Sequence, residues 1–471
     1  MKLWTTAELI EATGGTVSAP FGADGVSIDT RTLEQGDLFV ALLGEGRDGH
    51  GFVGDALAKG AAGAMVHEDV PADPLLRVDD TLGALHRLGA FARARFTGDR
   101  VTAITGSVGK TTSKEMLRAA LAVFGKTHAA VASYNNHWGV PLTLARMPRD
   151  ARYCVAEIGM NHAGEIAPLS RLVRPHVVLI TAITKAHVGN MGGIAAIADE
   201  KASIAAGLEP HGIAVLPLDT DQFPRLRDGA GKVQILTFGS DAAADVRLLG
   251  LEADADGSMV QVDIAGRTVR FRIAAPGAHM AMNAVAVLAT VVAMGLDPVT
   301  AISGLEGFSP LAGRGLRRTV TLPGGTFLLL DESYNANGAS MRAALDVLRL
   351  QPAKRRIAVL GDMLELGDEG PAEHSGLAET LTSSADLLFA CGPSMRHLFD
   401  AVPADKRAAH AANSHELAPM VAASIEAGDA VLVKGSLGSG MKRVVQALDA
   451  AASKINSDAA SPSLQTAAGA R

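Results

Sequence analysis

Cysteine is scarce in this chain of 471 residues, which contains only Cys154 and Cys391. Two thiols cannot build a disulfide framework, so we expect both to be buried and reduced. Aromatic side chains are also few, at 4% of the residues. The core must therefore be packed mainly from Ala, Val, Leu, Ile and Met.

An excess of basic residues is missing as well. The chain has 43 Lys and Arg against 50 Asp and Glu, a net charge of −7, and its pI is near 6.1. A protein that binds nucleic acid through its overall charge needs the opposite balance. We therefore expect no nucleic-acid partner, although local pockets can still bind anions.

Long apolar runs are limited too. The N-terminus lacks the apolar core of a signal peptide, and Thr5 and Glu8 instead have the capping-box spacing that begins a helix. The most apolar segment, Ala281 to Leu296, contains Asn283 and many small residues, which indicates a packed core helix rather than a membrane span. These features predict a cytoplasmic protein with no membrane span.

Three domains are expected from the length and the pattern of strands and helices. Residues 1–98 combine short strands with a polar glycine loop and predict a small α/β domain. Residues 99–313 alternate strand and helix, as in a doubly wound parallel sheet, with an irregular β-rich insert at 212–276. Residues 314–471 repeat a Rossmann-like α/β pattern. The tail from about residue 452 is rich in Ala and Ser and is predicted to be disordered.

The segment 101–116 has the order of a phosphate-binding loop. Val101 to Ile104 form the end of a buried strand, Gly106 and Gly109 allow a tight turn, and residues 111–121 begin a helix. This order directs backbone N–H groups and the positive end of the helix dipole at one point. Lys110 adds a charge there, and the Thr111 hydroxyl can contact a magnesium ion.

The strict P-loop pattern is not met, because its first glycine would fall at Ile104. The shorter G-x-x-G-K-T form stands in its place, and on this motif alone a structural turn stays open as an alternative. No Asn-Lys-x-Asp motif follows, which argues against a GTPase. A motor or helicase is disfavoured by the lack of a basic surface.

Three further side chains in the same domain could hold a metal ion. Glu157 ends a buried strand, His187 follows another, and Lys201 lies on a predicted helix. Strand ends are where ligands bind in such sheets, and carboxylates hold magnesium in ATP sites together with substrate phosphates. From the residues alone, a salt bridge at Glu157, an ordinary polar role for His187 and a surface position for Lys201 stay open.

Taken together, these motifs resemble the Mur ligases of peptidoglycan synthesis, whose own phosphate loop has the short form seen at Thr105 to Thr112. The other matching positions follow the family order, namely Glu157, His187, Lys201, His279, Asn283, Gly313, Arg314 and Asp331. The resemblance spans nearly the whole chain and implies three α/β domains: an N-terminal UDP-binding domain, a central ATP-binding domain and a C-terminal ligase domain.

Four stretches resemble the branch of this family that adds D-alanyl-D-alanine to UDP-N-acetylmuramoyl-tripeptide. They are residues 135–143, 331–337, 360–367 and 432–436. The Asp-Asn-Pro-Arg motif of the ligase that adds the third residue is absent. Two positions depart from the pattern of the branch, which has Asp where Glu332 stands and Arg where Leu437 stands.

The resemblance implies an ATP-dependent ligase that works through an acyl phosphate, with small-molecule substrates and a monomeric chain. Two alternatives stay open: a family ligase that adds another amino acid or acts on a folate-like carboxylate, and an ATP-binding regulatory protein on the same fold. The motifs at Thr30-Arg31 and Asp48-Gly-His50 favour a UDP-linked substrate over a folate.

Site roles follow from the same resemblance. ATP would be bound by Gly106, Ser107, Val108, Gly109, Lys110, Thr111, Thr112, Asn283, Arg314 and Asp331. Two magnesium ions would be bound by Thr111, Glu157, His187 and a carbamylated Lys201. Lys110, His187 and Lys201 would be catalytic. The UDP-linked substrate would be bound by Thr30, Arg31, Asp48, His50, Asn135 and Asn136.

Overall fold

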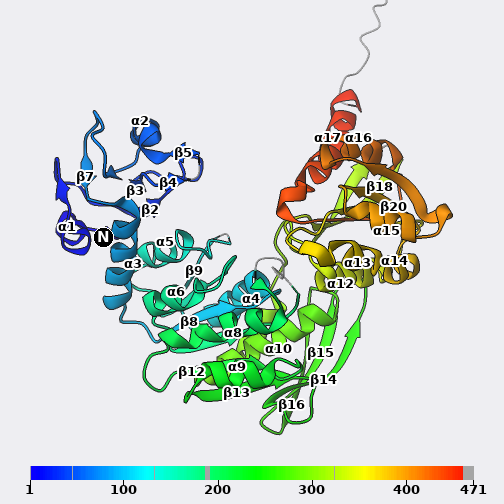
Figure 1. The fold of residues 1–471 in the computed structure, drawn as a ribbon, viewed down its shortest axis with the longest axis horizontal. Coiled ribbons are helices and arrows are strands. Elements are labelled where there is room, and N and C mark those ends of the chain that lie inside the picture. The colour runs from blue at the N-terminus through cyan, green and yellow to red at the C-terminus, as the bar shows by residue number, and fades with distance from the viewer. Residues whose placement is uncertain (1, 45, 132, 186–190, 323, 460–471) are drawn as a thin grey trace, which may run out of the picture.

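The computed structural model describes residues 2–44, 46–131, 133–185, 191–322 and 324–459. Three α/β units follow one another along the chain, and the central unit lies between the other two (Figure 1). Each unit is built around its own sheet of five, nine or six strands. This is the predicted three-domain α/β architecture.

The N-terminal unit has a five-stranded sheet with the order β1-β7-β6-β3-β2, in which only β1 is antiparallel to its neighbour. Its strands are β1 (Thr16–Val17), β2 (Gly25–Ser27), β3 (Asp37–Val40), β6 (Gly63–Val66) and β7 (Leu75–Arg77), with a small hairpin of β4 (Leu43–Gly44) and β5 (Arg47–Asp48). The helices are α1 (Thr6–Thr13), α2 (Val53–Ala58) and α3 (Thr81–Ala94). The predicted capping box is confirmed, because Thr5 and Glu8 each accept a hydrogen bond from the other's backbone N–H.

The central unit has a nine-stranded sheet with the order β16-β15-β14-β13-β12-β11-β8-β10-β9. The strands are β8 (Arg100–Thr105), β9 (Thr127–Ala129), β10 (Tyr153–Glu157), β11 (Val177–Ile180), β12 (Ile213–Pro217), β13 (Gln234–Gly239), β14 (Val246–Ala253), β15 (Ser258–Ile264) and β16 (Arg267–Ile273). All strands from β9 to β14 in this order pair in parallel, as predicted. The antiparallel β15 and β16 then extend the sheet, so most of the predicted irregular insert is regular structure.

Helices cover both faces of the central sheet. They are α4 (Lys110–Ala122), α5 (Gly139–Ala145), α6 (Ile166–Val173), α8 (Ile194–Ala202), α9 (Phe223–Ala230), α10 (Ala278–Ala293) and α11 (Pro298–Glu306). One apolar core includes residues of α4, α10 and α11, and a second includes residues of α5, α6, α8 and α9. Most of α10 is buried in the first core, which confirms the predicted core helix. Across the described part of the chain, no helix combines the length and apolarity that crossing a bilayer requires.

The C-terminal unit has a six-stranded sheet with the order β17-β18-β22-β19-β20-β21, parallel except for β17. Its strands are β17 (Leu316–Leu322), β18 (Gly325–Glu332), β19 (Arg356–Gly361), β20 (Leu387–Cys391), β21 (Arg407–Ala411) and β22 (Ala430–Lys434). The helices are α12 (Gly338–Arg349), α13 (Gly370–Ser375), α14 (Ala378–Ser384), α15 (Met395–Ala401), α16 (Ser414–Ser424) and α17 (Lys442–Ala459).

Two local predictions concern the thiols and the tail. Both cysteines are free and buried as predicted, and burial raises the pKa of Cys154 and of Cys391 to about 12. The tail is predicted to be disordered from about residue 452. In the structure α17 continues through Ala459, where alanine favours helix. Residues 460–471 lie outside the described residues.

His128 in β9 makes the stability of the central unit depend on pH. Its Nε2–H donates to the carbonyl of Thr143 at 2.7 Å, and burial lowers the pKa of the imidazole to about 4. The unfolded chain binds a proton below about pH 6.5 while the folded chain does not, so stability falls from there down to about pH 4, by roughly 3 kcal/mol in all. We expect His128→Gln to remove this loss in thermal unfolding measured against pH. The exposed His415→Gln is the control, and equal acid sensitivity in wild type and H128Q would contradict the assignment.

Candidate active site

The glycine loop joins the end of β8 to the start of α4. Gly106 has φ +148° and Gly109 has φ +83°, conformations that side-chain-bearing residues rarely adopt. A side chain at Gly106 would overlap Thr181 Oγ1, and a Cβ at Gly109 would lie 2.6 Å from Asn283 Oδ1. Both glycines are therefore needed for the backbone to pass between β11 and α10.

The first turn of α4 is open to an anion. Gly109 is the N-cap residue, and no side chain caps the helix. The first N–H groups of a helix have no partner within the helix, and the helix dipole places positive charge there. Ser107 fixes the loop from behind, because its N–H donates to Ala182 O at 2.8 Å and its hydroxyl donates to Thr184 O at 3.1 Å. The loop is thus a rigid site for phosphate.

Lys110 is folded back onto this loop. Its Nζ donates to Gly106 O at 2.6 Å and lies 3.5 Å from Ser107 O. Burial lowers the pKa of Lys110, the nearby Glu157 opposes this effect, and Arg314 adds to it. A partly buried ammonium whose hydrogen bonds to the described residues go to carbonyl oxygens is well placed to bind a phosphate oxygen instead.

Glu157, at the end of β10, anchors a network of polar side chains. Its Oε1 accepts hydrogen bonds from Thr111 Oγ1 at 3.1 Å and from Asn135 Nδ2 at 2.8 Å. The Thr111 hydroxyl lies 3.2 Å from Ser133 Oγ, which in turn accepts from Arg314 Nη2 at 2.7 Å. The network connects the phosphate loop to the start of the C-terminal unit.

The second carboxylate oxygen of Glu157 offers the clearest position for a bound cation. Oε2 is buried and has no hydrogen-bond partner among the described residues. A buried, unpaired carboxylate oxygen is costly, and an ion bound there would remove that cost. Carboxylate and hydroxyl oxygens are the hard ligands that Mg²⁺ prefers, so Glu157 and Thr111 fit a magnesium ion.

Lys201 on α8 is buried, at 1% exposure. Burial lowers its pKa well below the ordinary value, and the neighbouring Lys110 lowers it further, while Glu200 opposes both. The Glu200 carboxylate is already occupied by the backbone N–H groups of Gly164 and Ile166, at 2.8 and 2.9 Å. Within the described part of the chain we find no acceptor that hydrogen-bonds the Lys201 ammonium. Loss of the proton is therefore easier for this amine than for an exposed lysine.

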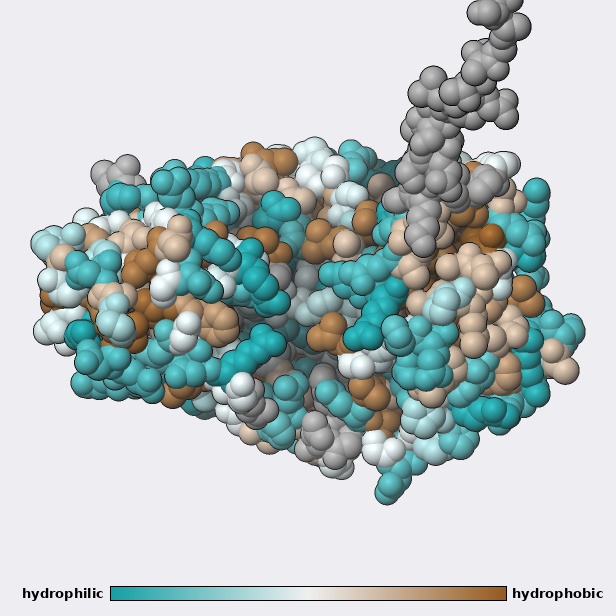
Figure 2. All heavy atoms as spheres, turned by 90° about the horizontal axis from the view of Figure 1, so that it is seen from above, coloured by the Kyte–Doolittle hydropathy of each residue, from teal (hydrophilic) through white to brown (hydrophobic). Residues whose placement is uncertain are grey.

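A cavity of about 480 Å³ lies between the central and C-terminal units, at the carboxyl ends of their parallel strands. The surface is hollowed between the two outer units, with hydrophilic side chains on both sides (Figure 2). The predicted residues that line the cavity are Ser107, Val108, Gly109, Lys110, Thr111, Thr112, Asn135, Asn136, Glu157, Asn283 and Arg314. Eleven predicted positions from five separate stretches thus line the same cavity.

Asp331, which is predicted to meet a ribose, makes local hydrogen bonds in this structure. Its Oδ2 accepts from Gly313 N–H at 2.9 Å, and its Oδ1 accepts from the N–H and hydroxyl of Ser333 at 3.1 and 2.6 Å. Its side chain is buried and is not part of the cavity lining. In this conformation Asp331 fixes the segment before β17, next to Arg314, whose guanidinium lies 4.0 Å from the ring centroid of Tyr334.

The four predicted residues of the N-terminal unit are not part of this cavity lining. Arg31 pairs with Asp29 at 2.6 Å and is largely exposed, and Thr30 offers its carbonyl to Lys59. His50 is buried, with Nδ1 only 2.6 Å from Asp48 Oδ1. Asp48 and His50 are therefore a coupled pair, whereas Thr30 and Arg31 belong to a neighbouring loop.

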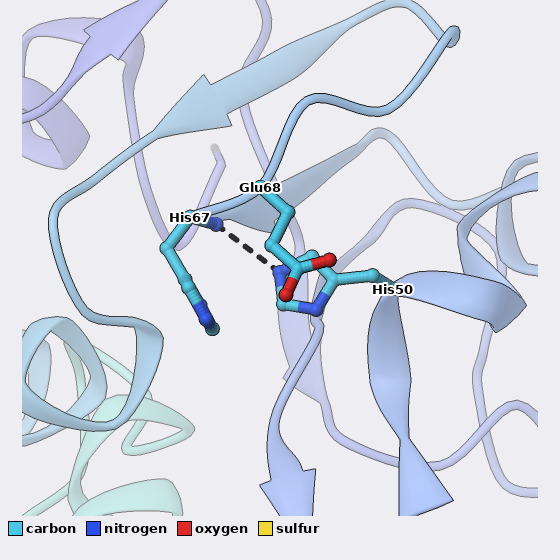
Figure 3. A group of neighbouring side chains, drawn as sticks. All are labelled: His50, His67 and Glu68. Carbon is cyan, nitrogen blue, oxygen red and sulfur yellow. Dashed lines mark hydrogen bonds between the residues drawn. The ribbon is translucent and has the colours of Figure 1, made fainter.

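His50 also lies beside His67 and Glu68 in a group with the composition of a metal site (Figure 3). The carboxylate of Asp48 holds the proton on His50 Nδ1, which leaves Nε2 as the acceptor. That nitrogen already accepts a hydrogen bond from the His67 N–H at 3.2 Å, drawn as the dashed line in Figure 3. Since the lone pair of His50 Nε2 is occupied by this hydrogen bond, we do not assign a metal ion to the group. Its hydrogen bonds stabilise the loop before α2.

Several residues of the cavity were not predicted as site residues. They are Ser133, Glu165, Glu332, Tyr334, Asn335, Lys434 and Ser436. Glu332 and Lys434 end β18 and β22, so their positions at strand ends were the available signal. Ser133 had no such signal, since it lies in an irregular segment. His187 lies outside the described residues.

Comparison with known families matches all three units. The Mur ligase family catalytic domain matches residues 23–90, the Mur ligase middle domain matches 104–291, and the Mur ligase glutamate ligase domain matches 317–437. The chain is 33% identical over 462 residues to the UDP-N-acetylmuramoyl-tripeptide--D-alanyl-D-alanine ligase of Bacillus subtilis, covering 94% of this chain and 98% of that one. It is 34% identical over 460 residues to the Escherichia coli ligase of the same name, with the same coverage.

Solved structures of this family have the same fold as this chain. The fold superposes on MurF from Acinetobacter baumannii with a TM-score of 0.82 and 32% identity, covering 95% of this chain and 99% of that one. The MurF ligase of Thermotoga maritima, solved with ADP, shares the fold with a TM-score of 0.75 at 24% identity, covering 92% and 98% of the two chains. The phosphate loop, the cavity between two α/β units and these matches lead to one conclusion: the chain belongs to the Mur ligase family, among the UDP-N-acetylmuramoyl-tripeptide--D-alanyl-D-alanine ligases.

Proposed function

We propose that this protein joins D-alanyl-D-alanine to UDP-N-acetylmuramoyl-tripeptide, with conversion of ATP to ADP and phosphate. The observation that carries the proposal is the cavity between the phosphate loop and the C-terminal strand ends. A ligase of this kind must bring a phosphate donor, a carboxylate and an amine together in one space that excludes water. The names of the B. subtilis and E. coli relatives support these substrates.

The reaction proceeds in two transfers. The terminal carboxylate of the tripeptide attacks the γ-phosphorus of ATP, and ADP leaves with its bonding electrons, giving an acyl phosphate. The dipeptide amine then attacks the acyl carbon, loses a proton, and the tetrahedral intermediate collapses to an amide and inorganic phosphate. Such transfers depend on positioning and on neutralising charge.

The phosphate loop supplies most of that neutralisation. The open N–H groups at the start of α4 bind the phosphates, and the Lys110 ammonium turns from Gly106 O to a phosphate oxygen. Arg314 reaches the same phosphates from the segment before β17 and is steadied by Tyr334. Groups held in place before the reaction stabilise the developing charge without reorganisation.

Thr111, Glu157 and His187 are proposed to hold magnesium, together with Lys201 as its carbamate. When bound, two Mg²⁺ ions supply positive charge next to the β- and γ-phosphates. A buried lysine whose pKa falls can react with CO₂ as the neutral amine, which turns a cation into a carboxylate-like ligand. The orphan oxygen of Glu157 supports this set.

The remaining predicted residues are proposed to bind the organic parts of the substrates. Asn283 meets the adenine, while Asp331 meets the ribose once it exchanges one of its contacts to Gly313 or Ser333. The uridine nucleotide is bound by Thr30, Arg31, Asp48 and His50. Asn135 and Asn136 contact the muramoyl peptide. We propose that the enzyme acts as a monomer, because one chain supplies both walls of the cavity. We also propose that it acts in the cytoplasm.

Lys201→Ala tests the carbamate. We expect it to reduce phosphate release by about a hundredfold or more, the range for loss of one preorganised charged group. Added formate or acetate should restore part of the rate, because a free carboxylate can occupy the space of the missing side chain. The rate is measured with the acid present and again after the acid has been diluted away, and the restored part of the rate should then be lost. Full activity of K201A without any acid would remove Lys201 from the mechanism.

The function itself is tested by phosphate release from purified protein with ATP and UDP-N-acetylmuramoyl-tripeptide. We expect release that depends on D-alanyl-D-alanine and a product that contains both substrates, identified by mass. Release with single amino acids but not with the dipeptide would assign the chain to a different reaction of the family. No release with any acceptor would contradict an enzymatic role.

A further inference from the structure

The C-terminal wall of the cavity contains a buried cation that the phosphates do not require. Lys434 ends β22, and its backbone lies in register with Glu332 at the end of β18. It lines the cavity and is only 2% exposed. The two cations proposed to bind phosphate, Lys110 and Arg314, are held instead by Gly106 O and Ser133 Oγ, in the network around the phosphate loop.

The Lys434 ammonium is held in place but not saturated. Its Nζ donates to Glu332 Oε2 at 3.3 Å and to Asn335 O at 3.0 Å. An ammonium group has three N–H donors, so one remains for a ligand in the cavity. A buried cation with one long contact to a carboxylate gains much from a second anion.

The opposite end of the same strand shows what a structural ion pair looks like in this domain. There Arg355 donates to both oxygens of the buried Asp429, at 2.9 and 2.7 Å. That pair is bidentate and is absent from the lining of the cavity. By contrast, the pair of Lys434 and Glu332 is monodentate, longer and next to open space. This difference indicates that Lys434 binds a ligand in the cavity and does not only stabilise the fold.

The surroundings of Lys434 indicate which anion it binds. Leu364 and Leu437 line the same cavity with 44% and 64% of their surfaces exposed. Exposed apolar side chains that line the cavity together with the Lys434 ammonium suit a small apolar molecule with one carboxylate. A nucleotide phosphate would instead use the glycine loop, where the backbone N–H groups of α4 are open.

We propose that Lys434 binds the terminal carboxylate of the incoming D-alanyl-D-alanine, and that Glu332 is a positioning residue that holds the Lys434 ammonium at the cavity wall. This inference rests on the proposed function. The carboxylate end is thereby fixed on the C-terminal wall, and the amine end points toward the phosphate loop where the acyl phosphate forms. Leu364 and Leu437 contact the methyl groups of the dipeptide.

The test compares D-alanyl-D-alanine with its C-terminal amide, which lacks the negative charge. We expect wild type to show a KM for the amide that is about ten- to a hundredfold higher, the range for a charged hydrogen bond. In Lys434→Met, the KM for the dipeptide should rise by the same factor, and the two ligands should become nearly equivalent. The KM values for ATP and for the UDP-linked substrate should change less than about twofold.

Asp429→Asn is the matched control, because it breaks the ion pair at the far end of β22. It should lower the unfolding temperature but keep the preference for the carboxylate over the amide. Asp400→Asn, at an exposed position of α15, should change neither. Glu332→Gln should raise the KM for the dipeptide, and Glu332→Asp should restore part of it. Should K434M not fold, Lys434→Arg keeps the charge and must retain the preference for the carboxylate.

Three results would overturn the assignment. Wild type could accept dipeptide and amide equally, or K434M could retain the wild-type preference. An increase in the KM for ATP alone would place Lys434 with the phosphates and would equally contradict it. Failure of the proposed function is distinguishable, since wild type would then release no phosphate with the dipeptide at all.

Discussion

Lys110→Met is expected to reduce phosphate release by about a thousandfold, at the upper end of the loss for a preorganised donor to a developing charge. Lys110 directly follows Gly109, and its Nζ lies 2.6 Å from Gly106 O. Methionine has a similar length but no charge, so the packing of α4 should persist. Single-turnover measurement of ADP formation at saturating ATP reports the loss directly.

The matched control for this variant is Lys126→Met. Lys126 has the same charge but is half exposed and pairs with Asp150 on the surface. Its replacement should leave the rate unchanged, because surface ion pairs contribute little. A K110M enzyme with a wild-type rate and an intact fold would show that the loop does not bind the reacting phosphate.

Glu157→Gln should have the second large effect, a loss of activity of about a hundred- to a thousandfold. It replaces a buried carboxylate whose Oε2 has no hydrogen-bond partner among the described residues, and the change in shape is minimal. Because the unpaired charge is removed, we expect the unfolding temperature without ligands to stay the same or rise. The gain in unfolding temperature on adding Mg²⁺ and ADP should be largely lost, since a ligand stabilises only the state that binds it.

These opposite effects on stability and activity separate a binding role from a structural one. Glu252→Gln is the control, since Glu252 pairs with Arg270 at an exposed position of the sheet. It should keep both the activity and the gain from Mg²⁺ and ADP. A lower unfolding temperature for E157Q without ligands, together with an unchanged gain from Mg²⁺ and ADP, would mean that Glu157 only supports the fold.

Much of the architecture was predictable from local patterns. The alternation of strands and helices predicts the parallel order of the central sheet, because parallel strands need crossover connections. The extension by β15 and β16 was missed because these strands present polar residues on one face. Arg270 and Arg272 pair there with Glu252 on β14 and with Asp254 just after it. Such alternation is typical of strands with one solvated face, but it does not show which strands pair, so the extension of the sheet was not visible in the sequence.

Site residues could be predicted where a short stretch of sequence contains the whole motif. They could not be predicted where their role depends on how the domains are arranged. The glycine loop carries its own signal, since Gly106 and Gly109 have positive φ. Asp331 lies at a strand end as expected, but its carboxylate is occupied by Gly313 and Ser333, which depends on the path of the connecting segment. Lys434 is an ordinary strand-end lysine in the sequence, and its proximity to the phosphate loop exists only across the two units.

The central claim is that the cavity directs a substrate carboxylate, rather than water, to the γ-phosphate of ATP. The most direct test uses UDP-N-acetylmuramoyl-tripeptide with ¹⁸O in its terminal carboxylate, followed by mass analysis of the released phosphate. Attack by the carboxylate transfers one labelled oxygen to each phosphate, so the account predicts singly labelled phosphate in step with product. Unlabelled phosphate from the labelled substrate would show that water is the nucleophile and would contradict the account.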